Sequence, residues 1–162
     1  METKKGAARA QESPVTVVAD NRRARFDYHI LDRVEAGLAL TGTEIKAIRE
    51  GRVNLRDSYA RINGREVWLF NAHIAPYSKG GRYNHDPIRP RKLLLHRRQI
   101  VALASQTAER GYTLVPLRLL LRRGRAKIEI AVARGKKQYD KREAVAKQTA
   151  QREIARALRR RE

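Results

Sequence analysis

A stretch of strict alternation constrains the fold of this chain more than any other feature. In residues 126–133, apolar side chains recur at every second position between charged or small ones: Ile128, Ile130 and Val132, against Lys127, Glu129 and Ala131. A period of two is typical of a β-strand with one buried face. We predict a hairpin that pairs this strand with residues 113–121 around a turn at residues 122–125. Pro116 has no backbone N–H to donate, so its strand should lie at a sheet edge or carry a bulge.

Shorter segments complete a predominantly β pattern. Residues 59–62 and 66–70 have strand character, and the Asn-Gly pair at residues 63–64 favours a tight turn between them. An earlier strand is predicted to begin near Phe26 and, after an interruption at Gly37, to continue to residue 40. Strand order does not follow from these local signals.

Two helices are predicted beside the strands. Thr41 and Glu44 fit a capping box at the start of a two-turn helix, and Gly51 suits its stop. A second helix is predicted from one apolar face in residues 100–108, and residues 76–92 are predicted to form a loop. Together these elements predict a mainly β protein with peripheral helices (α+β), built on a small closed or partly open β-barrel.

Charge limits the class of partner. The chain has 37 Lys and Arg residues against 17 Asp and Glu residues, a net charge of +20, and such a surplus favours a polyanion. Nucleic acid, an anionic membrane surface and acidic protein all qualify, and nucleic acid is favoured. The absence of cysteine excludes disulfides, thiolate catalysis and cysteine–zinc modules. No run of eighteen apolar residues occurs, so we expect a cytoplasmic protein without a membrane partner.

The charge distribution suggests three segments. Residues 1–20 are small, polar and net neutral, and are predicted to form a disordered extension. Residues 21–133 would form the RNA-binding barrel. Residues 134–162 carry 11 basic and 4 acidic residues, a net charge of +7. Their apolar stripe is narrow, so we predict a tail that is disordered when free and helical when an anionic partner neutralises it. A helix docked on the barrel is the alternative.

Basic clusters and tyrosines are the candidate contacts with RNA. Five clusters biased toward arginine lie at residues 22–25, 89–92, 97–98, 122–125 and 134–137. A guanidinium group can bind phosphate oxygens in bidentate fashion, whereas any single cluster is more often a solvated surface. The rings of Tyr77, Tyr83, Tyr112 and Tyr139 could stack on unpaired bases. For each of these tyrosines, packing on the barrel is an equal alternative.

Catalytic and metal-binding constellations are absent from the sequence. His29, His73, His85 and His96 have no spacing typical of a metal site. His85-Asp86 could suggest a general base with an orienting carboxylate, but a turn before Pro87 is the favoured interpretation. There is also no phosphate-binding glycine loop and no dinucleotide fingerprint. We therefore predict a protein that is not an enzyme and that needs neither a metal nor a cofactor.

Several blocks of residues resemble the signature blocks of the SsrA-binding protein family. They lie at residues 21–24, 35–37, 40–44, 57–59, 85–87, 91–95 and 133–142. The blocks occur in family order and at family spacing, and they span most of the chain. No single block is decisive, but together they are highly specific.

The resemblance implies a fold, a partner and a role. The fold would be a β-barrel of the oligonucleotide-binding type. The partner would be the tRNA-like domain of transfer-messenger RNA, whose elbow region the protein would bind in place of a missing anticodon arm. The complex would enter a 70S ribosome stalled on mRNA without a stop codon, and translation would switch to a tag-coding frame. No apolar seam calls for a dimer, so we expect a monomer that binds one RNA.

The resemblance also implies two sets of contact residues. The contacts with transfer-messenger RNA would be Asn21, Arg22, Arg23, Arg25, Glu35, Arg91, Lys92, Leu94 and His96. The contacts with small-subunit RNA, in the mRNA channel and decoding centre, would be Arg134, Gly135, Lys136, Lys137, Tyr139, Asp140, Lys141 and Arg142. The carboxylate of Glu35 could accept from base amino groups or ribose hydroxyls, or it could orient a neighbouring arginine.

Two alternatives to this function are compatible with the charge. A structural ribosomal protein could share both the charge and the barrel. A non-specific RNA chaperone of the cold-shock type could also do so, but it should carry a dense aromatic platform, and only 6% of this chain is aromatic.

Overall fold

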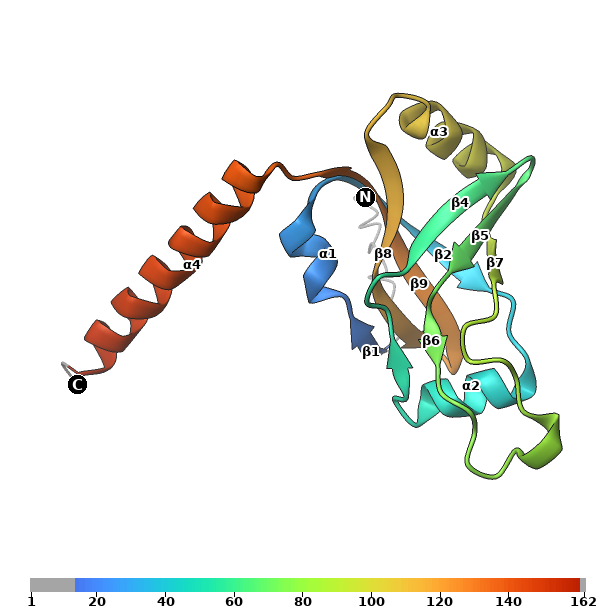
Figure 1. Ribbon diagram of the computed structural model, residues 1–162. Helices are drawn as coiled ribbons and strands as arrows, with labels where there is room; N and C mark the ends of the chain where they lie inside the picture. Colours follow the sequence, from blue (N-terminus) through green and yellow to red (C-terminus); the bar gives the residue numbers. More distant parts are fainter. Residues whose placement is uncertain (1–13, 161–162) are drawn as a thin grey trace, which may run out of the picture.

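The computed structural model describes residues 14–160, except for the side chains of residues 138–140. The chain forms a β-barrel with short helices around it, from which one long helix projects (Figure 1). The strands are β1 Val15–Asp20, β2 Tyr28–Leu38, β3 Val53–Asn54, β4 Tyr59–Asn63, β5 Glu66–Phe70, β6 His73–Ile74, β7 Arg91–Leu94, β8 Tyr112–Arg122 and β9 Arg125–Gly135. The helices are α1 Arg22–Asp27, α2 Gly42–Arg49, the 3-10 turn η1 Gly81–Tyr83, α3 Arg97–Thr107 and α4 Gln138–Arg159.

Antiparallel pairing closes six strands into a ring. Neighbours follow the order β8-β4-β5-β7-β2-β9, and β9 pairs again with β8. Strand β1 lies outside this ring on β8, while β3 and β6 form a separate two-stranded sheet. Closure satisfies the backbone groups that an open sheet would leave at its edges. The predicted class, a mainly β barrel of the oligonucleotide-binding type with peripheral helices, is confirmed.

The long hairpin predicted from the alternation is confirmed as β8 and β9. Arg122 pairs with Arg125, and both turn residues between them have positive φ, 52° at Arg123 and 74° at Gly124. Two successive positive φ values are those of a type I′ turn, which matches the right-handed twist of the flanking strands.

A bulge beside Pro116 connects the hairpin to the N-terminal segment. Pro116 pairs with Ile130 and Arg118 pairs with Glu129, so Leu117 is the extra residue. The carbonyl oxygens of Pro116 and Leu117 accept from Asn21, from its Nδ2 at 2.9 Å and its backbone N at 2.7 Å respectively. The predicted bulge is therefore confirmed, and its carbonyls are satisfied by a residue about 95 positions away.

Two apolar clusters hold the barrel and α1 together. The larger cluster fills the interior and includes Leu69, Leu93, Ile128 and Ile130. The smaller lies beneath α1 and consists of Ala24, Val115, Leu117, Ala131 and Ala133. Leu117, the extra residue of the bulge, belongs to this outer cluster, whereas Leu119, two residues later, packs in the interior cluster. The bulge thus interrupts the alternation of buried and outward side chains along β8. Burial of a leucine side chain contributes about 1.5–3 kcal/mol.

The two predicted barrel helices are present. The backbone N of Thr41 donates to Glu44 Oε1 at 3.0 Å, as the predicted capping box requires, and the positive φ of Gly51 (73°) follows the end of α2. Helix α3 follows His96, whose backbone N donates to Gln99 Oε1 at 2.9 Å.

No helix in residues 14–160 is long and apolar enough to cross a membrane.

Several local predictions are wrong. The strand predicted to begin near Phe26 begins only at Tyr28, because residues 22–27 form α1, which Asn21 caps and beneath which Ala24 is buried. Residues 15–20 of the supposedly disordered extension pair with β8, while residues 1–13 lie outside the described part. The first hairpin turns at residues 64–65, since Asn63 pairs with Glu66. The end of the predicted loop at residues 76–92 is the start of β7.

The basic tail contains one helix, α4, which extends away from the barrel (Figure 1). Most of its side chains are exposed, including Ile154 and Leu158 in the narrow stripe. The helical form is therefore seen without a partner, and disorder of the free tail stays a prediction.

Candidate nucleic-acid interface

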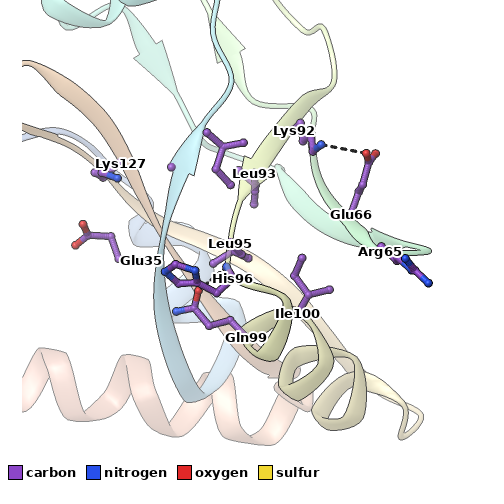
Figure 2. A pocket seen from close by; sticks show the side chains of 12 residues that line it. Glu35, Arg65, Glu66, Lys92, Leu93, Leu95, His96, Gln99, Ile100 and Lys127 are labelled. Atoms are coloured by element: carbon purple, nitrogen blue, oxygen red, sulfur yellow. Dashed lines mark hydrogen bonds and ion pairs between the residues drawn. The ribbon is translucent and has the colours of Figure 1, made fainter.

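An open hollow of about 480 Å³ lies where β2, β7, β9 and the start of α3 meet (Figure 2). Four residues that the sequence marked as RNA contacts line it: Glu35, Lys92, Leu94 and His96. Glu35 comes from β2, Lys92 and Leu94 from β7, and His96 from the residue before α3. The barrel thus brings together side chains that lie about 60 positions apart in the chain.

The hollow opens because β2 and β7 pair over only two positions. Gly37 pairs with Leu94 and Leu38 with Leu93. A Cβ at Gly37 would lie 3.2 Å from the Leu94 Cβ, so glycine is needed for the close approach of the two strands. The Leu94 side chain is exposed at the rim. It offers an apolar surface to the face of a base or a ribose.

Glu35 lies on the outer face of β2. Its neighbours Val34 and Ala36 pack with the interior cluster, so alternation directs Glu35 outward, opposite Glu129 on β9. Glu35 Oε2 lies 3.1 Å from Arg122 Nη2, and the Glu35 side chain is 34% exposed. Without RNA, the carboxylate thus orients an arginine, one of the two roles that the sequence left open for it.

The rest of the lining mixes donors and acceptors. Lys92 Nζ lies 3.0 Å from Glu66 Oε1, and Trp68 Nε1 donates to Glu66 Oε2 at 3.0 Å. These bonds, that from Lys92 first, hold the pKa of Glu66 below its ordinary value. Arg65 and Lys127 add two cations. Such a surface can bind phosphates through its cations and accept from base or ribose groups through its carboxylates.

A second hollow of about 370 Å³, here called the cationic hollow because all its charged lining residues are basic, lies between α1 and α4. Its charged lining residues are Arg22, Arg25, Lys136 and Lys147, and Phe26 supplies an aromatic ring. Repeated positive charge around one hollow suits phosphate groups. The N-terminal basic block and the tail therefore form one surface.

Asp27 joins α1 to the start of α4. Its backbone oxygen accepts from the Lys136 N at 2.9 Å, and its carboxylate lies 3.0 Å from Arg23 and 3.3 Å from Lys141. Burial raises the pKa of Asp27, but the bonds from Arg23 and Lys141 outweigh burial and lower it overall. The carboxylate thus stays charged and holds the base of α4 against α1.

Comparison with known proteins decides the family. The family model described as SmpB protein matches residues 18–160. This chain belongs to the SmpB family. The SsrA-binding protein of Carboxydothermus hydrogenoformans is 59% identical over 143 residues, which cover 88% of this chain and 96% of the relative. That of Roseiflexus sp. is 62% identical over 146 residues, covering 90% and 92%. The resemblance predicted from the sequence blocks is confirmed.

A solved SmpB-family structure shares the fold. Its description reads "tmRNA-SmpB: a journey to the center of the bacterial ribosome". The TM-score is 0.65 at 47% sequence identity, over 80% of this chain and 94% of that chain. At this identity, the alignment supports comparison of surfaces as well as of the barrel.

Two of the predicted RNA contacts are buried, which contradicts direct contact with RNA. Asn21 caps α1 by accepting from the Ala24 N at 3.2 Å, and its Nδ2 donates to Leu55 O and Pro116 O. Arg91 is 0% exposed. Its guanidinium donates to Glu44, to Ala72 O at 2.7 Å and to Pro87 O at 3.1 Å. In this SmpB-family chain both residues hold the barrel and its loops in place.

Of the other predicted contacts, only some line a hollow: the residues of this set in the cationic hollow are Arg22, Arg25 and Lys136. Arg22 and Arg25 lie away from Glu35, and Arg23 lies beside them in ion contact with Asp27. Arg134 and Gly135 end β9, and Lys136 and Lys137 lead to α4, which carries Lys141 and Arg142. Tyr139 and Asp140 also lie in α4, but their side chains fall outside the described part. Residue roles in RNA binding stay predictions.

Sequence reasoning missed Lys127 and Gln99, which line the Glu35 hollow, and it named Arg122, the ion-pair partner of Glu35, only as part of a basic cluster. Lys127 had a usable signal, because the alternation of β9 already directed it outward with Glu129. The proximity of Arg122 to Glu35 depends on the pairing of β2 with β9, which local sequence signals did not give. No group of three or more potential metal ligands occurs among the described residues.

Proposed function

We propose that this chain binds the tRNA-like domain of transfer-messenger RNA and delivers it to stalled ribosomes in the cytoplasm. The observation that carries the proposal is the shared hollow of Glu35, Lys92, Leu94 and His96. Family membership and the structural likeness to a tmRNA-SmpB complex support the same partner. One chain would bind one RNA. No catalysis by the chain is required.

The hollow would hold the elbow of the RNA through a change of partner at Glu35. In the free chain this carboxylate is paired with Arg122. RNA can offer amino and 2′-hydroxyl donors to Glu35 while a phosphate takes its place beside Arg122. Both charges would then remain paired in the complex. The residues proposed to bind this RNA are Glu35, Lys92, Leu94 and His96, with Lys127 and Arg122 added from the geometry.

The tail would bind in the mRNA channel only when the channel is empty. We propose that residues 134–162 enter the channel and decoding centre when mRNA has ended, with Lys136, Lys137, Tyr139, Lys141 and Arg142 among the contacts. The cationic hollow between α1 and α4 supports this role, because it gives the base of the tail a surface suited to phosphate. A filled channel would exclude the tail through competition for the same site.

Two variants test whether barrel and tail have separate roles. Glu35→Ala should weaken binding to labelled transfer-messenger RNA roughly 10- to 150-fold, since it removes a charge-assisted hydrogen bond. Glu109→Ala is the matched control, because it removes the same charge from an exposed position outside both hollows. A chain truncated after Lys137 keeps every barrel strand and should bind the RNA but fail to support tagging on truncated mRNA.

Titrations at several salt concentrations with ordinary tRNA as competitor complete the test. Each phosphate contact should add roughly 0.7–0.9 to the log–log salt slope. Equal affinity for both RNAs would return the chain to the class of non-specific basic RNA binders. Equal losses of RNA affinity in the Glu35 variant and the truncated chain would contradict the division of roles, as would tagging that persists without α4.

A further inference from the structure

A protruding loop carries the most exposed of the described aromatic side chains. Residues 76–84, which include η1, form the first part of the connection from β6 to β7 and extend beyond the barrel near α2 (Figure 1). Tyr83, at the end of η1, is 76% exposed, whereas the other described aromatic residues are half-buried. A tyrosine left in water contributes none of the burial energy that a core tyrosine provides. Its exposure therefore calls for an explanation.

The loop has a well-defined conformation. Tyr77 N donates to Asn84 Oδ1 and Asn84 Nδ2 donates to Tyr77 O, both at 2.8 Å, which ties the two ends together. Within the loop, Gly80 N donates to Tyr77 O at 3.0 Å and Tyr83 N to Gly80 O at 3.1 Å. A Cβ at Gly80 would lie 2.8 Å from the Asn84 side chain, and Gly81 has a φ of 54°. Each glycine thus permits a tight turn that another residue would strain.

The base of the loop is anchored to the barrel side. Lys46 of α2 lies 5.4 Å from the centroid of the Tyr77 ring, and Arg52 Nη1 donates to Pro76 O at 3.2 Å. After the loop, the His85 ring bridges Thr43 Oγ1 and Ile74 O, each at 2.9 Å. These contacts assign Tyr77 to packing. Because the loop is ordered without a partner, a ligand would bind it at little cost in conformational entropy.

Positive charge lies beside the exposed ring. Arg82 lies 5.1 Å from the centroid of the Tyr83 ring and donates to its hydroxyl at 3.1 Å. Lys79 is exposed on the same loop, and residues 76–84 contain no acidic side chain. Tyr83 is also the one exposed large apolar side chain of this loop. Cations beside one accessible ring suit a base with its phosphates better than an apolar protein surface.

We propose that the Tyr83 ring stacks on an unpaired base of RNA while Lys79 and Arg82 contact the neighbouring phosphates. The inference rests on the proposed RNA-binding function and adds a contact that neither hollow supplies. Two of the tyrosines that the sequence offered for stacking thereby differ in role. Tyr77 packs at the base of the loop, whereas Tyr83 binds an RNA base.

Substitutions at the ring test the proposal in the full-length chain. Dissociation constants are measured for transfer-messenger RNA, and tagging rates are measured with that RNA on 70S ribosomes stalled on truncated mRNA. Stacking on an aromatic ring is worth roughly 5- to 150-fold per base. Tyr83→Ala should reduce affinity or the tagging rate by that factor, and Tyr83→Phe, which keeps the ring, should stay within about twofold. Ile88→Ala is the matched control, since it shortens an exposed apolar side chain near the loop without removing a ring.

Three outcomes would overturn the proposal. The first is a Tyr83→Ala chain within about twofold of the wild type in both measurements. The second is a Tyr83→Phe chain as impaired as Tyr83→Ala, because the hydroxyl and not the ring would then make the contact. The third is an equal loss in Ile88→Ala, which would indicate an apolar protein surface. If the wild type does not prefer transfer-messenger RNA to tRNA, the proposed function fails, while the ratio of Tyr83→Ala to wild type on either RNA still decides the stacking contact.

Discussion

Replacing Glu44 with glutamine is expected to remove a pH-dependent part of the stability of the barrel. The Glu44 side chain is 0% exposed. It accepts from Arg91, Arg89 and the backbone N of Thr41. Burial by itself raises the pKa of this carboxyl, but the bonds from Arg91, Arg89 and Thr41 outweigh burial and lower it to about 2. The ion pair between Glu44 and Arg91 therefore joins α2 to β7 only while the Glu44 carboxyl is ionised.

The size and direction of the effect follow from linkage. The unfolded carboxyl takes up a proton near pH 4.5, whereas the folded one does so only near pH 2. Between these two pH values the unfolded state binds more protons than the folded state. The contribution of ionised Glu44 to stability is therefore complete above about pH 4.5 and is lost as the pH falls toward 2. The difference corresponds to roughly 3 kcal/mol of the free energy of unfolding.

Urea unfolding from pH 7 to pH 2.5 measures this contribution. The wild type should lose roughly 2–3 kcal/mol more than Glu44→Gln over this range. At pH 7 the variant itself should be less stable by about 3 kcal/mol or more, because Arg91 remains buried without its counter-ion. Glu109→Gln, at an exposed position, should follow the wild-type curve. Parallel curves for the wild type and Glu44→Gln would refute the reasoning.

Three further substitutions probe the bulge, the hollow and the base of the tail. Asn21→Ala removes the cap of α1 and the bonds to Leu55 O and Pro116 O, so urea unfolding should show a loss of roughly 2–4 kcal/mol. Gly37→Ala places a Cβ 3.2 Å from the Leu94 Cβ and should weaken binding to transfer-messenger RNA several-fold, whereas Gly42→Ala, which meets nothing within 4 Å, should not. Asp27→Asn removes the ion pair with Lys141, so amide exchange at the start of α4 should accelerate while exchange in the barrel strands stays unchanged.

Local patterns predicted those elements whose signals lie within a few residues. The alternation around Ile128 and Ile130 predicted the long hairpin, and Thr41 with Glu44 predicted the start of α2. The missing N–H of Pro116 predicted a sheet edge or a bulge, and the structure has a bulge there. The alternation through Tyr28 and Ile30 placed the start of this strand near Phe26, two residues too early, because residues 22–27 form the helix that Asn21 caps.

The hollow and the buried ion pair required information that no local pattern holds. Glu35 of β2 forms an ion pair with Arg122 of β8, although β9 lies between these two strands. Glu44 forms an ion pair with Arg91, which is 47 positions away in the sequence. Arg91 illustrates the limit: within its basic block it resembles a phosphate contact, yet it is buried against Glu44 and the carbonyls of Ala72 and Pro87. Charge in a sequence thus indicates the partner class, whereas burial decides which charges remain available to it.

Strand β9 sets the distance between the Glu35 hollow and the start of the tail. Lys127 near one end lines the Glu35 hollow, and Arg134 near the other is the first residue of the tail. Seven steps of a strand span about 23 Å. Because β9 is hydrogen-bonded to β2 on one side and to β8 on the other, this separation cannot stretch. The point at which the tail leaves the barrel therefore stays at a constant distance from the hollow proposed to bind RNA.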